Sequence, residues 1–490
     1  MQRHRNFTCI ALLLVSLGIA RAEPKASEYF GIRIVDQASG RGIPLVELRT
    51  TNEIRYVTDN AGWVAFQEPG LMHREVCFTI SGPGIDAPKD GFGFSCVRGM
   101  ATPGSTLVHQ VLNTNIATRI GRLTGQGMYR DSELLGKPHP LPNSNQQGVV
   151  GQDSVQAVIY QKKQFWLWGD TSVAHYPLGN FHSTCAWVKP DYDPEQGIDF
   201  AYISDAADAK KLRRMMPSDQ PGAIWIFGLL TIEDQGRERL FGGYTRQQQL
   251  GKILEQGIAE YDDQAGIFRK ASEARAGDFW HTPHGHAVRH QEFIYFSGPF
   301  AHTRVLAQAD AVKDPSQYES YSFDPATEQW SWKKSTTPTT QQQEQQMRRD
   351  ETMKQSSAAY LMRDAAGQSI NMHGASIQWN AWRNKWILIG VQSGNATDPS
   401  PLGEVWYSES DAITGPWRSA VKIASHPRYT FYNPVQHAFL QREGGKILYF
   451  EGTYTKQFSG NTEATMRYDY NQLMYRLDLS DQRLQPARVP

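Results

Sequence analysis

A pattern of paired strands recurs five times between residue 151 and the C-terminus. Each copy has an apolar strand, a short polar turn, and an aromatic strand that ends near a glycine. The pairs begin at Val155, Ala223, Ala287, Ala375 and Ala438. Further strand-like runs follow each pair, and repeated units of about four strands are the sequence signature of a propeller. The repeat therefore predicts a five-bladed β-propeller over residues 151–490.

The composition agrees with an all-β protein. The chain has 13 Trp, 21 Tyr, 21 Phe and 42 Gly, and aromatic strands interrupted by glycine turns are typical of β folds. Lys and Arg total 50, as do Asp and Glu. This balance lacks the basic excess expected of a nucleic-acid-binding protein, so we expect no nucleic-acid partner.

The first 22 residues have the pattern of a secretory signal peptide. Arg3 and Arg5 precede an apolar run that ends at Ile19, and Ala20-Arg21-Ala22 supplies small residues for cleavage. No later stretch approaches the roughly 18 continuous apolar residues of a membrane helix. We therefore expect a secreted or periplasmic protein without an integral membrane segment after cleavage.

Residues 23–112 consist of short strand-like runs separated by turn signals, which predicts a small β-sandwich. The order of Val35-Asp36, Gly40 to Glu47 and Thr58 to Gly62 resembles the transthyretin-like, carboxypeptidase-regulatory type of domain. That resemblance implies a sandwich domain placed before an exported enzyme.

Three cysteines remain after the signal peptide. Cys77 and Cys96 lie in neighbouring strand-like runs, and an exported protein meets an oxidising compartment, so a disulfide between them is open. Cys185 lies in a strand pattern and is predicted to be a buried free thiol. No paired Cys spacing and no His-Glu-x-x-His helix supports a zinc site.

Three segments connect or interrupt these units. Residues 113–150 are predicted to be a packed linker, with a short amphipathic helix from Ile116 to Leu123. Residues 334–365 have a Gln-rich run without apolar period, so a mobile surface insertion, partly helical at best, is expected. The aromatic run from Tyr470 to Asp478 is expected to close the last blade.

Polar residues recur where the propeller would bring them together. The innermost strand of a blade begins beside the axis, and the next strand returns antiparallel, so its end lies beside that beginning. The residues at these two places are Asp153, Asp170, His284, His286, His373, Ser376, Gln392, Asn433, His437 and Glu451. They predict one axial pocket, which is the candidate site.

Carboxylates facing each other across such a pocket suit glycoside hydrolysis, in which one acid protonates the leaving oxygen and the other attacks the sugar or activates water. Asp153 is the candidate nucleophile or base, and Glu451 is the candidate acid. Asp170 would orient or tune Asp153. An Asp after Gly at a strand end also caps turns, so a structural role stays open for each.

Five further residues are candidates for substrate binding: His286, His373, His437, Asn433 and Arg246. Histidines at corresponding places in three blades suit contacts to sugar hydroxyls, but hydrogen bonds to neighbouring blades would explain them too. Trp166 and Trp168 alternate with smaller residues and are predicted to be blade-packing core.

The opening Gly151-Gln-Asp153-Ser154 and the strand from Phe165 to Thr171 resemble a group of exported bacterial five-bladed propellers related to glycoside hydrolases. The group includes endo-D-arabinanases and, more distantly, arabinanase and levanase-type propellers. The resemblance implies that Asp153 serves as nucleophile or base. The chain departs from the distant relatives in having His286 and His373 where they have acids.

These patterns together predict a secreted, glycan-active enzyme, most simply a glycoside hydrolase acting on a polysaccharide or oligosaccharide. Two alternatives stay open. One is a polysaccharide lyase that uses His and Tyr to abstract a proton beside a uronate, and the other is a non-catalytic glycan-binding propeller. No cofactor is required for any of these, an axial calcium stays open although no ligand loop indicates it, and the oligomeric state is not specified.

Overall fold

The computed structural model describes residues 28–142, 144–394 and 402–488. These residues are mostly β-strand with a few short helices, so the all-β expectation is confirmed. The predicted signal peptide lies outside the described residues. Within them, no helix has the length and apolarity needed to cross a membrane.

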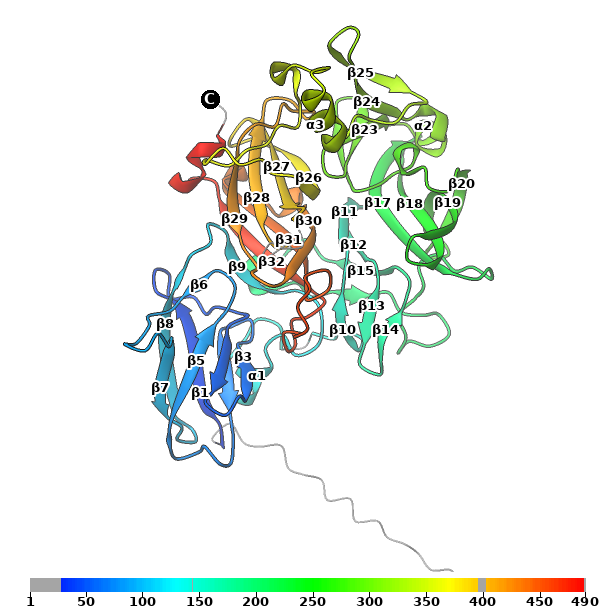
Figure 1. The fold of residues 1–490 in the computed structure, drawn as a ribbon. Helices are drawn as coiled ribbons and strands as arrows, with labels where there is room; N and C mark the ends of the chain where they lie inside the picture. The colour runs from blue at the N-terminus through cyan, green and yellow to red at the C-terminus, as the bar shows by residue number, and fades with distance from the viewer. Residues whose placement is uncertain (1–27, 143, 395–401, 489–490) are drawn as a thin grey trace, which may run out of the picture.

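The N-terminal unit is a sandwich of two four-stranded sheets (Figure 1). One sheet has the order β4 (Trp63–Phe66), β1 (Phe30–Asp36), β8 (Thr106–Asn113) and β6 (Ile85–Asp86), with β1 and β8 parallel. The other has the order β3 (Arg55–Val57), β2 (Glu47–Thr50), β5 (Glu75–Ser81) and β7 (Cys96–Met100). Buried residues alternate along β5, as a half-buried strand requires, and Ile32, Phe66 and Phe78 meet in the core. The sandwich is therefore present, and its transthyretin-like kinship stays a prediction.

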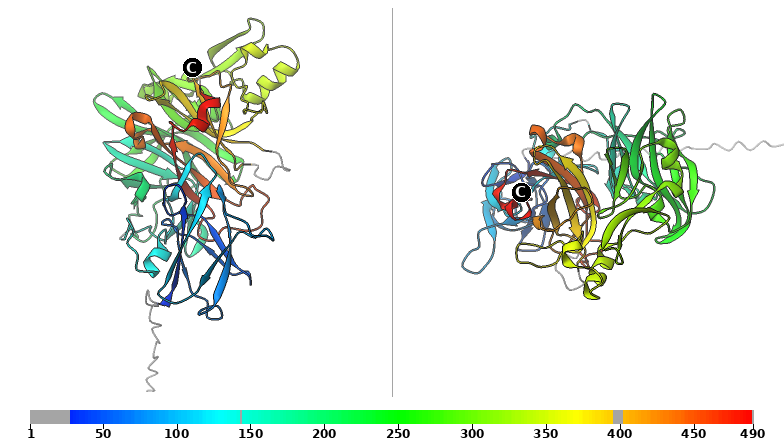
Figure 2. Two further views of the ribbon diagram at one scale, coloured as in Figure 1. Left: turned by 90° about the vertical axis from the view of Figure 1, so that its left-hand side faces the viewer. Right: turned by 90° about the horizontal axis from the view of Figure 1, so that it is seen from above.

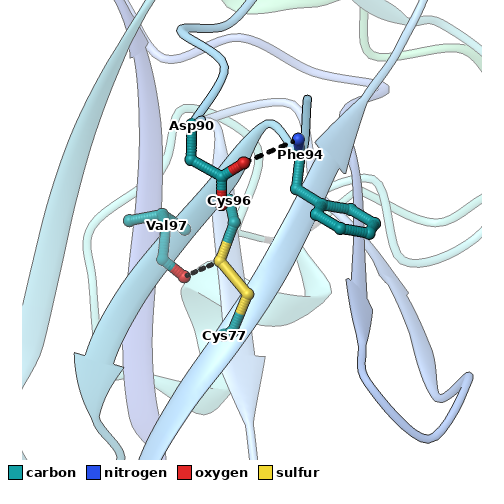
Figure 3. The surroundings of a disulfide bond; sticks show 5 residues. All are labelled: Cys77, Asp90, Phe94, Cys96 and Val97. Atoms are coloured by element: carbon teal, nitrogen blue, oxygen red, sulfur yellow. Dashed lines mark hydrogen bonds between the residues drawn. A yellow bond between two sulfur atoms is a disulfide. The ribbon is translucent and has the colours of Figure 1, made fainter. Parts of the chain in front are cut away.

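Cys77 and Cys96 form a disulfide between β5 and β7, with their Cα atoms 5.9 Å apart. Figure 3 shows the bond beside the loop that holds Asp90 and Phe94. Cys185 is free and fully buried, as expected. Burial raises the pKa of the Cys185 thiol well above its usual range, so this residue is a packing element of the core.

Five larger antiparallel sheets follow along the chain. The first has β11 (Gln156–Tyr160), β12 (Lys163–Trp168), β15 (Thr184–Val188) and β16 (Ala201–Tyr202). The second has β17 (Ala223–Asp234), β18 (Arg237–Gln249), β19 (Lys252–Asp262) and β20 (Ile267–Ala274). The third has β21 (His286–His290), β22 (Phe293–Ser297), β23 (Ala301–Leu306), β24 (Glu319–Asp324) and β25 (Gln329–Lys334). The fourth has β26 (Met372–Asn380), β27 (Lys385–Gln392), β28 (Val405–Ser410) and β29 (Ala420–Ala424). The fifth has β30 (Thr430–Gln436), β31 (Ile447–Thr455), β32 (Asn471–Asp478) and β9 (Thr118–Arg122).

The first strands of these sheets neighbour one another in chain order, β11 beside β17, then β21, β26 and β30. The fifth sheet returns to the first, because Asn433 Nδ2 donates to Ser154 Oγ at 2.7 Å. The sheets are arranged around a common centre (Figure 2). This is the order of a β-propeller, and a complete ring of five blades stays a prediction.

The helix expected at Ile116 to Leu123 is wrong, because this segment forms strand β9. It pairs antiparallel with β32, Gly121 opposite Met474. Ile120 is 4% exposed and packs in the core between the first and fifth sheets. Hydrogen bonding to the open edge of β32 favours a strand here, although the apolar residues of this segment have helical spacing. The expected linker therefore contributes a strand to the last sheet.

Strand β9 also ties the sandwich to these sheets. The buried Arg119 guanidinium donates to the carbonyls of Pro44 and Pro83 at 2.8–3.0 Å. Asn60 exchanges two hydrogen bonds with the backbone of Arg122. The sandwich is therefore joined to the sheets by a buried polar contact at β9.

The segment 334–365, expected to be a mobile insertion, is instead packed around helix α3 (Gln341–Arg349). The helix begins with a capping box, in which the Thr340 hydroxyl accepts from the Gln343 backbone N–H and the Gln343 side-chain carbonyl accepts from the Thr340 backbone N–H. The buried Glu344 carboxylate accepts two backbone N–H groups of the following loop at 2.6 and 2.8 Å. The polar side chains of this segment form hydrogen bonds with buried backbone groups. A search for a repeating pattern of apolar residues cannot detect such contacts.

The remaining elements are short. Helix α1 (Arg130–Leu134) packs against β4 and helix α2 (Ala309–Lys313) against β23. Turns of 3₁₀ helix lie at Pro194–Gln196, Phe279–His281, Pro315–Gln317, Gln355–Ser357, Ala438–Leu440, Glu443–Gly445 and Gln482–Ala487. A three-stranded sheet is formed by β10 (Val149–Gln152), β13 (Thr171–Val173) and β14 (Tyr176–Asn180). In the sequence, β10 precedes the first larger sheet, and β13 and β14 lie between its strands β12 and β15. This small sheet leads directly into the candidate site.

Candidate functional site

Asp153 and Asp170 lie side by side at the end of the three-stranded sheet. Asp153 follows β10 and Asp170 precedes β13. Their backbones are joined, since Asp153 N donates to Asp170 O at 3.2 Å, and Asp170 N donates to Asp153 Oδ1 at 2.9 Å. A Cβ atom on Gly169 would stand 2.4 Å from Asp153 Oδ1. Glycine is therefore required there to let the Asp153 carboxylate lie against the backbone.

The Asp153 carboxylate is surrounded by donors. The Tyr432 hydroxyl donates to Oδ2 at 2.8 Å, and Tyr470 and Ser154 contribute further side-chain hydrogen bonds. Burial raises the pKa of Asp153, and these hydrogen bonds oppose the rise. Because hydrogen bonds to a carboxylate favour its charged form, this surrounding selects Asp153 as the ionised member of the pair.

Asp170 has a poorer set of donors. The Trp225 indole N–H donates to Asp170 Oδ1 at 2.6 Å. Burial and the charge of Asp153 raise the pKa of Asp170 to about 7. Two coupled carboxyl groups release their protons in sequence, and the unequal donor sets place the retained proton on Asp170. The pair can therefore supply one base and one acid near neutral pH.

Both carboxylates open into a cavity of about 360 Å³ between the first, second, third and fifth sheets. Trp225 and Phe227 of β17 and Phe279 form one side of it, which we call the aromatic wall. Gln156, Gln247, His286 and Asn433 contribute polar groups. None of the described lining residues is a Lys or Arg. An apolar wall with a few converging polar groups is the usual form of a small-ligand site.

His286 is the one predicted histidine that lines this cavity. Burial, with a smaller contribution from His437, lowers the pKa of His286 to about 3. The imidazole is therefore neutral at physiological pH, and can both donate and accept a hydrogen bond. It follows Gly285, whose φ is +52° and where a Cβ would stand 1.9 Å from Ser297 O.

Three residues around Asp153 have left-handed backbone conformations that side chains rarely adopt. Their φ angles are +53° at Ser154, +51° at Asn433 and +61° at Tyr470. Each such residue costs about 1–3 kcal/mol, and such residues cluster at functional sites. Part of the backbone strain of the described chain therefore lies at the candidate base, and other such residues lie elsewhere.

Glu451, the expected acid, is not in the cavity. It is fully buried, and His437 Nε2 lies 2.6 Å from Glu451 Oε1. Trp166 packs on His437 with ring centroids 4.6 Å apart. A bulge in β30 between Tyr432 and Val435 shifts the register, and Val435 lies opposite Glu451. Glu451 and His437 are therefore enclosed between the first and fifth sheets, and the carboxylate beside Asp153 is Asp170.

Two other expected residues also lie elsewhere. His373 is exposed at the start of β26 and is absent from the cavity lining. Arg246 donates to Glu255 Oε2 at 3.0 Å and to the Pro221 carbonyl at 2.7 Å, which hold its side chain away from the cavity. Asn433, by contrast, lines it.

Two tryptophans and one further histidine of the predicted set lie in the core. Trp166 and Trp168 are fully buried, as the core prediction required. His284 is buried, with Nδ1 2.8 Å from the Thr282 carbonyl and Nε2 3.3 Å from Thr303 Oγ1. These contacts make His284 a structural residue.

Several site residues were missed from the sequence, among them Gln156, Trp225, Tyr432 and Tyr470. The alternation in Ala223-Ile-Trp-Ile-Phe227 places Trp225 and Phe227 on one face of a strand, which was a usable signal. Tyr432 and Tyr470 come from segments far from Asp153 in the sequence. Only the assembled sheets bring their hydroxyls to its carboxylate.

No group of three or more His, Cys, Asp or Glu side chains in the described part of the chain is arranged to hold a metal ion. The axial calcium left open by the sequence has no such ligand set there.

No family model and no curated protein matches the chain. Among solved structures, a putative hydrolase from Bacteroides ovatus is 15% identical, with a TM-score of 0.42, over 67% of this chain and 86% of that one. An exo-1,5-α-L-arabinanase from a bovine ruminal metagenomic library is 9% identical, with a TM-score of 0.35, over 67% and 93%. The catalytic domain of a Coprinopsis cinerea GH62 α-L-arabinofuranosidase is 9% identical, with a TM-score of 0.32, over 75% and 98%. The second and third of these structures are glycoside hydrolases by name, and likenesses of this degree carry no statement about the chemistry of this chain.

Proposed function

We propose that this protein is a glycoside hydrolase that cleaves a polysaccharide or oligosaccharide in the cavity of Asp153 and Asp170. One observation carries the proposal. Two adjacent carboxyl groups with unequal hydrogen-bond partners open into one cavity beside an aromatic wall. Carboxyl pairs whose environments separate their pKa values are the acid and base of glycoside hydrolysis.

In this mechanism Asp170 is the acid, in place of Glu451. Its proton passes to the glycosidic oxygen while the bond between that oxygen and the anomeric carbon breaks. Asp153 then either bonds to the anomeric carbon or removes a proton from the water that does so. The Trp225 N–H stabilises the Asp170 carboxylate that remains, and the Tyr432 hydroxyl holds Asp153 in place.

The cavity favours an uncharged sugar at the cleaved bond. A uronate carboxylate there would face Asp153 and Asp170, and the described lining residues include no cation to neutralise it. A lyase needs such neutralisation in its transition state. The neutral His286 imidazole suits a sugar hydroxyl, and the aromatic wall suits the apolar face of a sugar ring.

The proposal includes export, as the predicted signal peptide requires. Its test is a screen of the protein beginning at Glu23 against arabinan, xylan, levan and polygalacturonate. New reducing ends without the ultraviolet absorbance of unsaturated sugars would support hydrolysis. Unsaturated ends would establish a lyase, and binding without cleavage of any polymer would establish a glycan-binding protein; either result would reject the proposed function.

A further inference from the structure

A second and larger cavity, of about 930 Å³, borders the three-stranded sheet from the turn after β13 to Asn180 at the end of β14. The turn from Val173 to His175 forms one part of it, and the segment from Asp205 to Pro217 forms another. We call it the basic groove, after the four cations in its lining: Lys210, Lys211, Arg213 and Arg214.

The charge of this groove departs from that of the chain. The protein has 50 basic and 50 acidic residues, whereas the groove lining has four cations and one acid, Asp205. Lys211 lies 3.5 Å from Asp208, and Arg213 donates to two backbone carbonyls. Within the described ranges no ion pair is formed by Lys210 or Arg214. Clefts lined by one sign of charge concentrate ligands of the other sign.

A buried amide with no partner lines the same groove. Asn180 is 8% exposed, and among the residues that the structure describes neither its side-chain nitrogen nor its side-chain oxygen has a hydrogen-bond partner. Leaving a buried polar group unpaired costs about 1–3 kcal/mol, and such groups in folded proteins call for an explanation. A ligand that supplies an acceptor to the Asn180 NH₂ group and a hydroxyl to its carbonyl would satisfy both atoms.

The groove is also close to the proposed site of cleavage. Asn180 lies opposite Thr171, which directly follows Asp170. Strand β13 leads from Asp170 to Ala174 in the groove lining, and a strand rises about 3.3 Å per residue, so the two places are about 13 Å apart. A glycan of a few sugars is long enough to span that distance.

We propose that the basic groove is a second binding site, which takes the carboxylate, sulfate or phosphate groups of an acidic glycan whose neutral sugar is cut in the cavity. This substrate class rests on the proposed function. Cations supply affinity for the anionic group, and Asn180 supplies hydrogen bonds to the oxygen atoms around it. A glycan is favoured over a nucleic acid because the groove adjoins a sugar-sized cavity and the chain as a whole has no basic excess.

The test is affinity electrophoresis of the protein in gels that contain dextran sulfate, polygalacturonate or uncharged dextran, at several NaCl concentrations. Both acidic polymers are expected to retard the protein, with retardation falling as salt rises, and dextran is not. The double variant Lys210→Gln/Arg214→Gln is expected to bind the acidic polymers about tenfold more weakly. Asn180→Asp, which adds a negative charge in the same shape, is expected to weaken binding at least as much.

The matched control is Lys89→Gln/Arg98→Gln, which removes two exposed charges from the sandwich and is expected to bind as the unchanged protein does. Unaltered binding by the groove variants, with melting temperatures preserved, would overturn the proposal. Equal weakening by the control would overturn it too. Single-stranded DNA is added as a further probe. If the protein binds DNA as tightly as it binds the acidic glycans, and Asn180→Asp does not change that binding, the groove attracts polyanions in general and the proposal is overturned.

Asp153→Asn separates this inference from the proposed function. It is expected to bind the acidic polymers normally while losing cleavage. If Lys210→Gln/Arg214→Gln loses binding to the acidic polymers, the proposed binding site is supported whether or not any polymer is cut. If cleavage depends on Asp153 but the groove variants bind normally, only the proposed binding site is rejected.

Discussion

Asp153 and Asp170 are chemically identical side chains to which the fold gives opposite roles. Asp153 accepts from two tyrosine hydroxyls and a backbone N–H, whereas Asp170 accepts from one indole and faces the charge of Asp153. The difference in donors decides which carboxyl group keeps its proton. The hydrogen-bond partners therefore determine which of the two aspartates acts as base and which as acid in the proposed mechanism.

The pH dependence of cleavage should report the proton on Asp170. The acid must be protonated to act, and the pKa of Asp170 is raised to about 7. We expect kcat/KM to fall tenfold for each pH unit well above that value, and to be lost in the alkaline range. Initial rates measured from pH 4 to pH 10 on the best polymer of the screen check this. A rate that stays constant from pH 6 to pH 9 would exclude Asp170 as the acid.

Stability should respond to the same group with a defined sign. The ordinary pKa of an Asp is 3.8, and that of Asp170 is about 7 in the folded protein. Between these values the unfolded chain loses a proton that the folded chain keeps, so the free energy of unfolding falls as pH rises from about 4 to about 7. Asp170→Asn should remove this loss, which is on the order of 4 kcal/mol at about 1.4 kcal/mol per pKa unit.

Urea unfolding of both proteins at pH 4 and pH 8 measures that difference. The advantage of Asp170→Asn over the unchanged protein should be larger at pH 8. An equal difference at the two pH values would mean that Asp170 has an ordinary pKa.

Glu451→Gln should separate burial from catalysis. Glu451 is enclosed with His437 and lines no part of the cavity. We expect cleavage within about threefold of the unchanged protein, and a free energy of unfolding lower by about 1–3 kcal/mol, because the buried hydrogen bond to His437 is weakened. Asp170→Asn is the matched control, since it should lose cleavage. A loss of more than a hundredfold in Glu451→Gln at unchanged stability would restore Glu451 as the acid.

At the scale of elements, the site depends on strands that meet only after folding. Strand β9 and its partner β32 come from opposite ends of the chain, and the contact between Thr124 and Asn471 spans 347 residues. The Tyr470 hydroxyl that reaches Asp153 belongs to the loop that enters β32. Closure of the last sheet is thus coupled to the position of the candidate base.

Removal of β9 should therefore unfold the sheets. We compare a chain that begins at Ile116 with one that begins at Thr124, both without the sandwich. The shorter chain lacks the partner of β32 and the buried Ile120, and it exposes an unpaired strand edge that promotes aggregation. We expect a cooperative thermal transition only for the longer chain. Equal melting temperatures would mean that β9 is dispensable.

The local features of the site were predictable, and the distant ones were not. Asp153, Asp170, His286 and Asn433 follow from strand ends in single blades, where local pattern is sufficient. Glu451 was misplaced because β31 continues to Thr455, so Glu451 lies inside the strand and not at its end, and the bulge in β30 leaves Val435 opposite it. The strand at β9 and the buried Glu344 of α3 depend on partners that no local window contains.

At the scale of the whole molecule, the sandwich, the ring-ordered sheets and the small β10–β13–β14 sheet converge on one region. The small sheet carries Asp153 and Asp170 at one end and borders the basic groove from the turn after β13 to Asn180. A chain that binds a polymer along this sheet would place its cut bond beside the two carboxyl groups. In the proposed mechanism these two carboxyl groups perform the cleavage.

The most direct test is the rate of polymer cleavage by Asp153→Asn and Asp170→Asn beside the unchanged protein, with melting temperatures measured on the same samples. Loss of a base or an acid typically costs 10²–10⁴-fold in rate, so we predict a fall of at least about a hundredfold in each variant, with melting temperatures that do not fall by more than a few degrees. Cleavage within about tenfold of the unchanged protein in either variant would contradict the proposed mechanism.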